Sequence, residues 1–491
     1  MIASASTLWY DLLFAGKLPP ASSLFEERFG ISKEEMKKIL SIALSKGGQF
    51  SELFFEYRIN NVILMEEEII KETGEHITLG VGIRVLKNDQ TGYGYTNEMT
   101  FDKMKETALT AAAIASENKA IQPADLTVKK LSHQYYDMNQ PLHSMKLDQK
   151  INLVKAAHAG AKDYDNRISK VFARLADEIQ YVTIMNSEGL FISDVRPQSR
   201  IMVKSTAEQG DRRNTGTYGV GGGRVGLSYY QNEKTPNQIG EESAEEAITL
   251  LSADDSPAGE HTVVLGSEGS GVLIHEAIGH PLEADANWKK TSIMADKMGQ
   301  MVANPIVTII DDATIPHYRG TLNIDDEGTE TEPVLLIENG KLVNYMHDIL
   351  SSRLMHTKSN GHGRRASYRF NPIPRMNNTL LAKGNATPEQ VITSVKKGFY
   401  AKTFTGGMVS DSGKFTFSVN TGYLIENGKL TRPLKNATLV GTNVQILNDV
   451  DMIANDMGFF LGVCGKDGQG VAALCGTPTL RIKKMTVGGR A

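Results

Sequence analysis

The heptapeptide Leu-Ile-Glu-Asn-Gly-Lys-Leu occurs twice in the chain, at residues 336–342 and 424–430. Each copy places Asn-Gly between apolar runs, and this dipeptide is the strongest short signal for a two-residue β-hairpin. Two such hairpins predict a large antiparallel sheet in the C-terminal region. Internal duplication is one explanation of the repeat, and chance recurrence of a common turn formula is the other.

The composition is that of an ordinary globular protein, with 40% hydrophobic and 22% charged residues. A chain of 491 residues exceeds what one core usually fills, so we expect two or three domains. The net charge of -4 gives no basic surface for nucleic acid, and we expect no nucleic-acid partner. Two cysteines cannot build a disulfide framework, which indicates a reducing compartment.

The N-terminus lacks the pattern of a targeting segment. MIASASTLWYDLLFAGKLPP has no basic residue ahead of its apolar part, and Asp11 interrupts that part. A secretory signal needs a basic start and an unbroken apolar core, so we expect none. No run reaches the roughly 18 apolar residues that a membrane helix requires, so we expect no membrane association. These features predict a cytoplasmic protein.

The N-terminal half mixes helices with strands. A capping-box pattern at Ser32 and Glu35 opens a helix that Gly47 can close in the left-handed conformation. Periodicity predicts two further helices at about 101–118 and 147–163. Strand-like runs lie at 51–58, 61–70, 77–86 and 91–96. The glycine-rich stretch 215–226 lacks the Gly-Lys-Ser/Thr of a phosphate-binding loop, so we expect a flexible loop or strands that other backbone approaches closely.

A polar segment with a proline and a glycine, residues 252–260, marks the main predicted domain boundary. We expect an N-terminal extension with a helix at 1–45 and an N-terminal α/β domain at 46–255, with a mixed or antiparallel sheet. A C-terminal β-rich domain at 256–491 would then carry the metal-site helix described next. The predicted fold class is therefore α+β.

The residues from His275 to His280 read His-Glu-Ala-Ile-Gly-His. The common zinc-peptidase pattern places two histidines four residues apart on one helix face. Here the spacing is five, which separates the side chains by about 140° on an ideal α-helix and prevents both from binding one metal. A π-type turn would restore the alignment; Gly279 lowers its steric cost, and Pro281 discourages a regular helix beyond it. A metal site therefore requires an irregular helix at 275–281.

The residue types at this motif fit hydrolytic chemistry at zinc. Neutral imidazoles bind zinc, and a catalytic zinc keeps three protein ligands and one open position for water. Glu276 could take a proton from that water and deliver it to the leaving amine. The alternative is an ordinary helix whose histidines are solvated or satisfied within the core, and spacing alone does not decide between them.

The spacing supplies no third ligand. Cys464 lies in a glycine-flanked loop after an apolar run, where a thiolate could point into a site. Cys475 lies among small apolar residues, which is typical of a buried structural thiol. The candidates are therefore Glu283, Asp285, Cys464, Cys475 and a distant histidine.

From about residue 46 to its C-terminus, the sequence resembles the TldD branch of the TldD/PmbA family of metalloproteases, formerly called modulators of DNA gyrase. The resemblance rests on long blocks in the same order. They include PAGEHTVVLGSEGSGVLIHEAIGHPLEAD, VTIIDDATIPHYRGTLNIDDEGTETEPVLLIENGKL, NGHGRRASYR, GGMVSDSGKFTFS, VCGKDGQG and PTLRIKKMTVGG. Pro281, directly after the second histidine, is a local departure that removes no ligand.

The resemblance implies a zinc-dependent peptidase that cleaves unfolded or modified peptides bound in extended form. It implies His275, His280 and Cys464 as metal ligands and Glu276 as the catalytic residue. It also implies an α+β fold and either a homodimer or a heterodimer with a TldE (PmbA)-like subunit, which typically lacks this metal set. The alternatives are a non-catalytic subunit and a regulatory binding protein. The intact Glu276 favours the enzyme, because a structural metal site needs no general base.

Overall fold

The computed structural model describes residues 21–115, 121–409 and 413–489. The segment on which the expectation of no targeting signal rests, residues 1–20, lies outside the described residues. Within the described ranges, no helix combines the length and apolarity needed to span a membrane. The structure mixes helices with sheets of seven, six, eight and two strands, so the predicted α+β class is confirmed.

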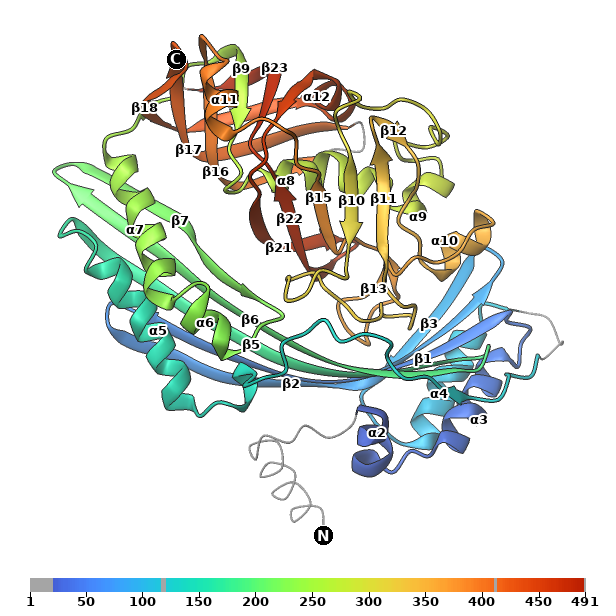
Figure 1. Cartoon of the computed structure of the whole chain (residues 1–491). Coiled ribbons are helices and arrows are strands. Elements are labelled where there is room, and N and C mark those ends of the chain that lie inside the picture. Colours follow the sequence, from blue (N-terminus) through green and yellow to red (C-terminus); the bar gives the residue numbers. More distant parts are fainter. Residues whose placement is uncertain (1–20, 116–120, 410–412, 490–491) are drawn as a thin grey trace.

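A long, curved seven-stranded sheet forms the N-terminal part (Figure 1). The strand order is β3-β2-β1-β5-β6-β4, with β7 also paired to β6. Only β4–β6 is parallel among these pairs, so the sheet is mixed, as expected. The strands are β1 (Phe50–Glu66), β2 (Ile69–Lys87), β3 (Gln90–Thr96), β4 (Thr127–Val128), β5 (Ile168–Asn186), β6 (Leu190–Gln209) and β7 (Arg212–Gly223).

Strand β1 shows where the predicted strands were wrong. The runs 51–58 and 61–70 are not two strands, because β1 continues through Asn61 and pairs with both β2 and β5. The side-chain amide of Asn61 donates to Asp177 of β5 at 3.2 Å, within the continuous strand. The chain turns later, at Glu67 and Glu68, whose φ angles of 48° and 66° are left-handed.

Helices cover the outer, convex face of this sheet (Figure 1). The glycine-rich stretch is strand β7, and helix α7 packs directly on it. A Cβ at Gly216 or Gly219 would overlap a backbone carbonyl oxygen of α7, that of Ser243 or Ile239 respectively. The expectation of strands closely approached by other backbone is therefore confirmed. The helices of this half are α2 (Ala21–Phe29), α3 (Lys33–Leu44), α4 (Phe101–Ala112), η1 (Leu142–Ser144), α5 (Leu147–Lys162), α6 (Leu227–Asn232) and α7 (Pro236–Leu251).

The capping box at α3 forms as predicted, with Ser32 accepting from the backbone of Glu35 and Glu35 accepting from the backbone of Ser32. Gly47 follows the helix at a φ of 89°. Helices α2 and α3 share one hydrophobic cluster with β1, β2 and α4. The residues just before position 45 thus pack on the sheet, and the division at 45 stays a prediction.

Two further sheets make up the C-terminal part, which lies over the concave face of the long sheet (Figure 1). The eight-stranded sheet has the order β16-β9-β23-β19-β17-β18-β8, with β20 paired to β23, and the extra β16–β17 pairing closes five strands into a barrel. The six-stranded sheet has the order β12-β11-β10-β15-β22-β21. A small pair, β13 with β14, lies apart from both.

The bounds of these elements follow the chain. The strands are β8 (Asp254–Asp255), β9 (Gly259–Leu265), β10 (Ile309–Asp312), β11 (Pro333–Glu338), β12 (Lys341–Leu342), β13 (Gly363–Arg364), β14 (Ile373–Pro374), β15 (Asn378–Leu381), β16 (Lys397–Val409), β17 (Lys414–Glu426), β18 (Lys429–Lys435), β19 (Ala437–Thr442), β20 (Val450–Ile453), β21 (Gly458–Lys466), β22 (Gln469–Thr477) and β23 (Leu480–Gly488). The helices outside the metal motif are α9 (Ala284–Trp288), α10 (Ile349–Leu354), α11 (Pro388–Thr393) and α12 (Asn443–Asp449).

Both copies of the repeated heptapeptide form the predicted hairpins. Asn339 and Gly340 join β11 to β12, and Asn427 and Gly428 join β17 to β18. All four turn residues have positive φ, from 47° to 81°, as a type I′ turn requires. The two hairpins belong to different sheets, however, so they do not build one large antiparallel sheet.

Buried ion pairs join the long sheet to the C-terminal part. Arg84 of β2 binds Glu52 of β1 at 2.7 Å and Glu327 of a C-terminal loop at 2.6 Å. Arg365, from the segment after β13, binds the same Glu52. These side chains are 0–1% exposed, so each charge depends on its partners.

Replacing Arg84 with Met should lower the free energy of unfolding by about 3–5 kcal/mol, because Glu327 would lose the one arginine that pairs with it in the described structure. Urea denaturation followed by circular dichroism measures the change. Lys103→Ala, which breaks an exposed pair with Glu106, is the matched control and should have no measurable effect. A loss below about 1 kcal/mol in Arg84→Met would contradict a tightly coupled network.

Candidate metal centre

The histidine motif lies on an irregular helix. It begins with α8 (Gly271–Ile274), continues as a π-turn, η2 (His275–Gly279), and ends as a 3₁₀ turn, η3 (His280–Leu282). The backbone N–H of His280 donates to the carbonyl oxygen of His275, a bond between residues five apart. The irregular helix that a metal site requires at 275–281 is therefore present, and it turns both imidazoles toward one side.

Two glycines allow this helix to sit against the six-stranded sheet. A Cβ at Gly271 would lie 2.7 Å from the carbonyl oxygen and 2.8 Å from the carbonyl carbon of Cys475 in β22. A Cβ at Gly279 would overlap the sulfur of the fully buried Met376. Contact with the backbone of β22 at one end, and with the segment before β15 at the other, therefore fixes the position of the helix.

Three possible ligands converge at this contact. One ligand atom from each of His275, His280 and Cys464 lies within 4.8 Å of the other two. The imidazole rings are 5.1 Å apart at their centroids and nearly perpendicular, and Cys464 Sγ lies 3.5 Å from His280 Nε2. A tetrahedral zinc with bonds of about 2.0–2.3 Å places its ligand atoms about 3.3–3.8 Å apart. The donor types and this separation both fit zinc.

The ring of His275 provides a second test of fit. His275 is 4% exposed, and its Nδ1 is buried with no hydrogen-bond partner among the described residues. A buried polar atom without a partner costs free energy, so such atoms usually have an unseen partner or a function. An imidazole in this state beside a cysteine sulfur fits a ring that serves a metal.

Cys464 reaches the group from the end of strand β21, not from a loop as the sequence suggested. In the antiparallel β21–β22 pair it lies opposite Val471, and the turn follows at Asp467 and Gly468. The guanidinium of Arg375 donates to the backbone oxygen of Cys464. The cysteine is therefore held at a strand position that is anchored from both sides.

Electrostatics favours the thiolate of Cys464, the form that binds metals. Burial would raise the pKa of this thiol, but His275 and His280 lower it to about 5. Burial would lower the pKa of His280, but Glu283 and Cys464 raise it to about 9. The lowered pKa of the thiol and the raised pKa of the imidazole together favour a Cys464 thiolate beside a protonated His280 when no metal is bound.

A carboxylate behind His280 fixes its ring. Glu283 Oε2 lies 3.0 Å from His280 Nδ1, which leaves Nε2 directed at Cys464. Burial would raise the pKa of Glu283, but Lys466, at 2.9 Å, and His280 lower it to about 2. A carboxylate on the far nitrogen is the usual partner of a metal-binding histidine, because it sets the tautomer and the ring orientation.

The structure therefore narrows the open choice of a third ligand. Cys464 joins the histidines, whereas Glu283 contacts His280 from behind and Asp285 pairs with Lys466 at 2.7 Å. Cys475 is buried beside His275, where its sulfur raises the pKa of that histidine against the effect of burial, but it is outside the group of three.

Glu276 lies at the open side of the group. Its Oε2 is 3.9 Å from His280 Nε2, and its side chain is 22% exposed. It is not one of the three grouped residues. Its carboxylate can therefore reach both solvent and the space in front of the ligand atoms.

Sequence reasoning missed the charges that support this group. Lys466 and Arg375 lie near Glu283, at 2.9 Å and 3.9 Å, although neither belongs to the histidine motif. The signal for Lys466 was its place two residues after Cys464, on the same face of the strand. No local pattern marks Arg375.

Comparisons with known proteins agree along most of the chain. Profiles of the PmbA/TldA metallopeptidases match it in three parts: domain 1 at residues 51–115, the central domain at 140–251 and the C-terminal domain at 258–489. A metalloprotease TldD homolog from Haemophilus influenzae is 37% identical over 94% of this chain and 97% of that protein. A zinc metalloprotease TldD homolog from Saccharolobus solfataricus is 28% identical over 92% of this chain and 100% of its own.

Solved structures share the fold. A protein from Thermotoga maritima, named as a modulator of a DNA gyrase, superposes with a TM-score of 0.77 at 21% identity over 93% of this chain and 100% of its own. TldE from Thermococcus kodakarensis gives a TM-score of 0.72 at 17% identity, again over 93% of this chain and 100% of its own. At such identities the likeness concerns the fold alone.

Replacing Glu283 with Gln should weaken zinc binding by about 10- to 100-fold, because His280 would lose the carboxylate that orients its ring. Competition with a chromophoric chelator measures the affinity. Asp285→Asn is the matched control: it also removes a carboxylate from Lys466, but it does not touch His280. Equal affinities of Glu283→Gln and the unmodified protein would contradict the orienting role.

Proposed function

Because the chain belongs to the PmbA/TldA family of metallopeptidases, we propose that it is a zinc-dependent peptidase that cleaves unfolded or modified peptides bound in extended form. One observation carries the choice of site. The π-turn brings His275 and His280 together at a spacing that a regular helix would not allow, and Cys464 meets them there. The name of the Saccharolobus solfataricus relative supports zinc as the metal.

The roles of the side chains follow from their positions. His275, His280 and Cys464 would hold the zinc, which when bound supplies a Lewis acid to the scissile carbonyl and activates a water molecule. Glu276 takes a proton from the attacking water on its carboxylate and passes it to the nitrogen of the leaving amine. The carboxylate of Glu283 keeps the Nδ1 proton of His280 in place throughout, so that Nε2 stays available.

Extended peptides fit the edge of the sheet that carries Cys464. Strand β21 ends the order of the six-stranded sheet, and its outer edge is unpaired in the described chain. An added strand can bind there through backbone hydrogen bonds, with little dependence on sequence. A cavity of about 530 Å³ follows this edge, lined by Phe459, Phe460 and Leu461 of β21 and by Thr217, Tyr218 and Val220 of β7.

We also propose a dimer and a cytoplasmic location. The dimer would be a homodimer or a heterodimer with a TldE (PmbA)-like subunit, as the family resemblance implies, and the shared fold with TldE is compatible with both. Both cysteines are free thiols in the structure, which suits a reducing compartment. The alternatives are a non-catalytic subunit and a regulatory binding protein.

Replacing Glu276 with Gln should reduce peptide cleavage by at least about 10²-fold while leaving zinc content unchanged, because the variant removes the proton acceptor and no ligand. Turnover of an unfolded fluorogenic peptide and elemental analysis provide the two measurements. Full cleavage by Glu276→Gln would favour a different base. A protein that binds peptides without cleaving them would favour the regulatory alternative.

The two cysteines give a matched pair of variants. Cys464→Ser should lose zinc and activity, whereas Cys475→Ser should retain both, because only Cys464 joins the histidine pair. Both thiols are 2% exposed, so the packing cost of the two changes is similar. Loss of zinc from Cys475→Ser with retention in Cys464→Ser would reverse the assignment.

A further inference from the structure

A second cavity, of about 180 Å³, lies where strands β5 and β6 of the long sheet face the C-terminal part. Its wall is unusually rich in arginine, and we call it the arginine cavity. Among its lining residues are two carboxylates and six arginines: Glu178, Asp326, Arg58, Arg196, Arg224, Arg319, Arg364 and Arg365.

Three of these arginines have their own carboxylates. Arg58 binds Glu56 at 2.5 Å. Arg196 binds Asp326 at 2.5 Å and Asp194 at 3.0 Å. Arg365 binds Glu52, as described above. These pairs account for Asp326. The second carboxylate, Glu178, lies 4.0 Å from Arg58 and accepts from the amide of Asn60 at 3.4 Å. The amide of Gln198 lies between Glu178, at 3.1 Å, and Arg319, at 2.6 Å.

The other three arginines have no carboxylate of the described chain within ion-pair distance. Arg224, Arg319 and Arg364 are 3%, 8% and 4% exposed, and none forms an ion pair among the described residues. Their guanidiniums donate instead to backbone oxygens, those of Thr321, Gly462 and Ala472 respectively, at 2.8–3.1 Å. A carbonyl oxygen satisfies an N–H but does not neutralise the charge.

The pKa values of these three arginines are lowered, as expected for buried cations without a contacting carboxylate. Burial lowers the pKa of Arg319 to about 9, with further lowering by Arg200 and a smaller opposing effect of Glu178. Burial lowers the pKa of Arg364 to about 10, against an opposing effect of Asp326. Burial also lowers the pKa of Arg224. Glu178 and Asp326 act on these three charges only from beyond ion-pair distance. Buried charges are normally paired directly, so three guanidiniums around one cavity without a contacting carboxylate in the described structure favour an anion there.

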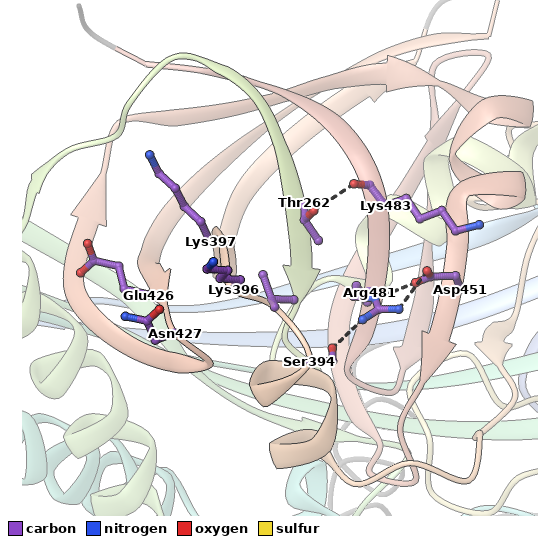
Figure 2. Close-up of a pocket in the computed structure, with 10 residues that line it drawn as sticks. Thr262, Ser394, Lys396, Lys397, Glu426, Asn427, Asp451, Arg481 and Lys483 are labelled. Atoms are coloured by element: carbon purple, nitrogen blue, oxygen red, sulfur yellow. Dashed lines mark hydrogen bonds and ion pairs between the residues drawn. The ribbon is translucent and has the colours of Figure 1, made fainter.

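A larger basic cavity elsewhere in the structure provides a comparison in which the cationic side chains are paired or exposed to solvent. Figure 2 shows that cavity of about 610 Å³, where Arg481 holds Asp451 through two contacts of 2.8 and 2.9 Å. The lysines beside it, Lys396, Lys397 and Lys483, are exposed to solvent. Its charges are paired or hydrated, so that cavity has no need of an anion.

The arginine cavity lies next to the metal group along the chain. Val463, on its wall, directly precedes Cys464 in β21. Consecutive Cα atoms are about 3.8 Å apart, although the two side chains leave opposite faces of the strand. Val471, also on its wall, is paired with Cys464 across β22. Val463 is 60% exposed, so this part of the wall is open to solvent.

The cavity also continues the groove proposed for extended peptides. Along β21, the groove is lined up to Leu461 and the arginine cavity by Val463. Along β6, the groove is lined by Arg200 and the arginine cavity by Gln198. A strand added to the edge of β21 would therefore run toward Arg224, Arg319 and Arg364.

We propose that the arginine cavity binds a carboxylate of the peptide substrate, close to the bond that is cut. The proposal rests on the peptidase function proposed above. Guanidinium groups match carboxylates in shape and bind them through paired hydrogen bonds. The carboxylate is either the C-terminal carboxylate of the peptide or an acidic side chain near the cleaved bond.

The test compares matched peptides on the zinc-loaded protein. One neutral sequence is prepared with a free C-terminal carboxylate and as the C-terminal amide, and the amide is also prepared with one Gln changed to Glu. A charged hydrogen bond lost from a buried site should lower kcat/KM for the neutral amide by about 10- to 100-fold. Recovery with the free C-terminus assigns the terminal carboxylate, and recovery with Glu assigns the side chain. Equal kcat/KM for all three overturns the proposal and leaves the peptidase function intact.

The same comparison remains decisive if no peptide is cleaved, an outcome that would count against the peptidase function. Calorimetric affinities of the three peptides for the zinc-loaded Glu276→Gln protein then provide the readout. Tighter binding of a carboxylate-bearing peptide, by about 10-fold or more, supports the cavity as an anion site. Equal affinities, or no binding of any peptide, overturn the proposal.

Arg319→Gln separates binding from a structural role. This change should bring the ratio of kcat/KM between the carboxylate-bearing and neutral peptides close to one, and Arg319→Lys should restore part of the ratio. Arg481→Gln, in the cavity of Figure 2, is the matched control and should leave the ratio unchanged. If Arg319→Gln lowers turnover of both peptides in proportion, the arginine is only structural and the proposal fails.

Discussion

The metal centre depends on one backbone hydrogen bond, from the N–H of His280 to the carbonyl oxygen of His275. In a regular α-helix that N–H would bond four residues back, and side chains five apart would point about 140° away from each other. The wider turn removes that divergence. The π-turn is tolerated because residue 279 is glycine: the sulfur of Met376 occupies the position that a Cβ would need. The ligand spacing is therefore a consequence of backbone geometry, and the histidines alone do not produce it.

The second requirement is that a strand from a distant part of the chain ends at this helix. Cys464 lies 184 residues after His280, and only the order of the six-stranded sheet brings the two together. Helix α8 rests on the backbone of Cys475 in β22, and β22 pairs in turn with β21. A ligand on β21 is thus one strand away from the strand on which the helix sits. A metal at this point would tie the helix to the sheet edge.

The local parts of this arrangement could be predicted from the sequence. The spacing of His275 and His280 predicts an irregular helix, and the two Asn-Gly pairs predict their hairpins, because each pattern reports on a few neighbouring residues. The sequence pattern did not show which sheet each hairpin joins, since sheet membership depends on contacts between distant segments. The runs 51–58 and 61–70 were wrongly separated for the same reason, because pairing with the distant strand β5 continues β1 through Asn60 and Asn61.

The third metal ligand also could not be identified from local sequence patterns. The spacing of the motif did not distinguish Cys464 from Glu283 or Asp285 as the third metal ligand. The family resemblance pointed to Cys464, which residue chemistry alone did not. In the structure the carboxylate of Glu283 contacts His280, Lys466 and Arg375. It therefore supports a metal-binding histidine and is not itself in the group of ligands. Burial and neighbouring charge decide between such roles, and neither can be seen in a linear pattern.

The buried charges explain why the long sheet and the metal centre hold a fixed relation. Arg84 and Glu327 form one such ion pair. When both partners of a buried ion pair are replaced by apolar groups, the protein often loses no stability, so these pairs are better understood as fixing geometry than as strengthening the fold. They hold β1 and β2 against the C-terminal loop, and β6 thereby faces β21 across the groove. Arg224, Arg319 and Arg364 differ from the paired arginines, because they donate to backbone oxygens and have no carboxylate among the described residues within ion-pair distance. Their cost is better explained if the missing negative charge arrives with a ligand.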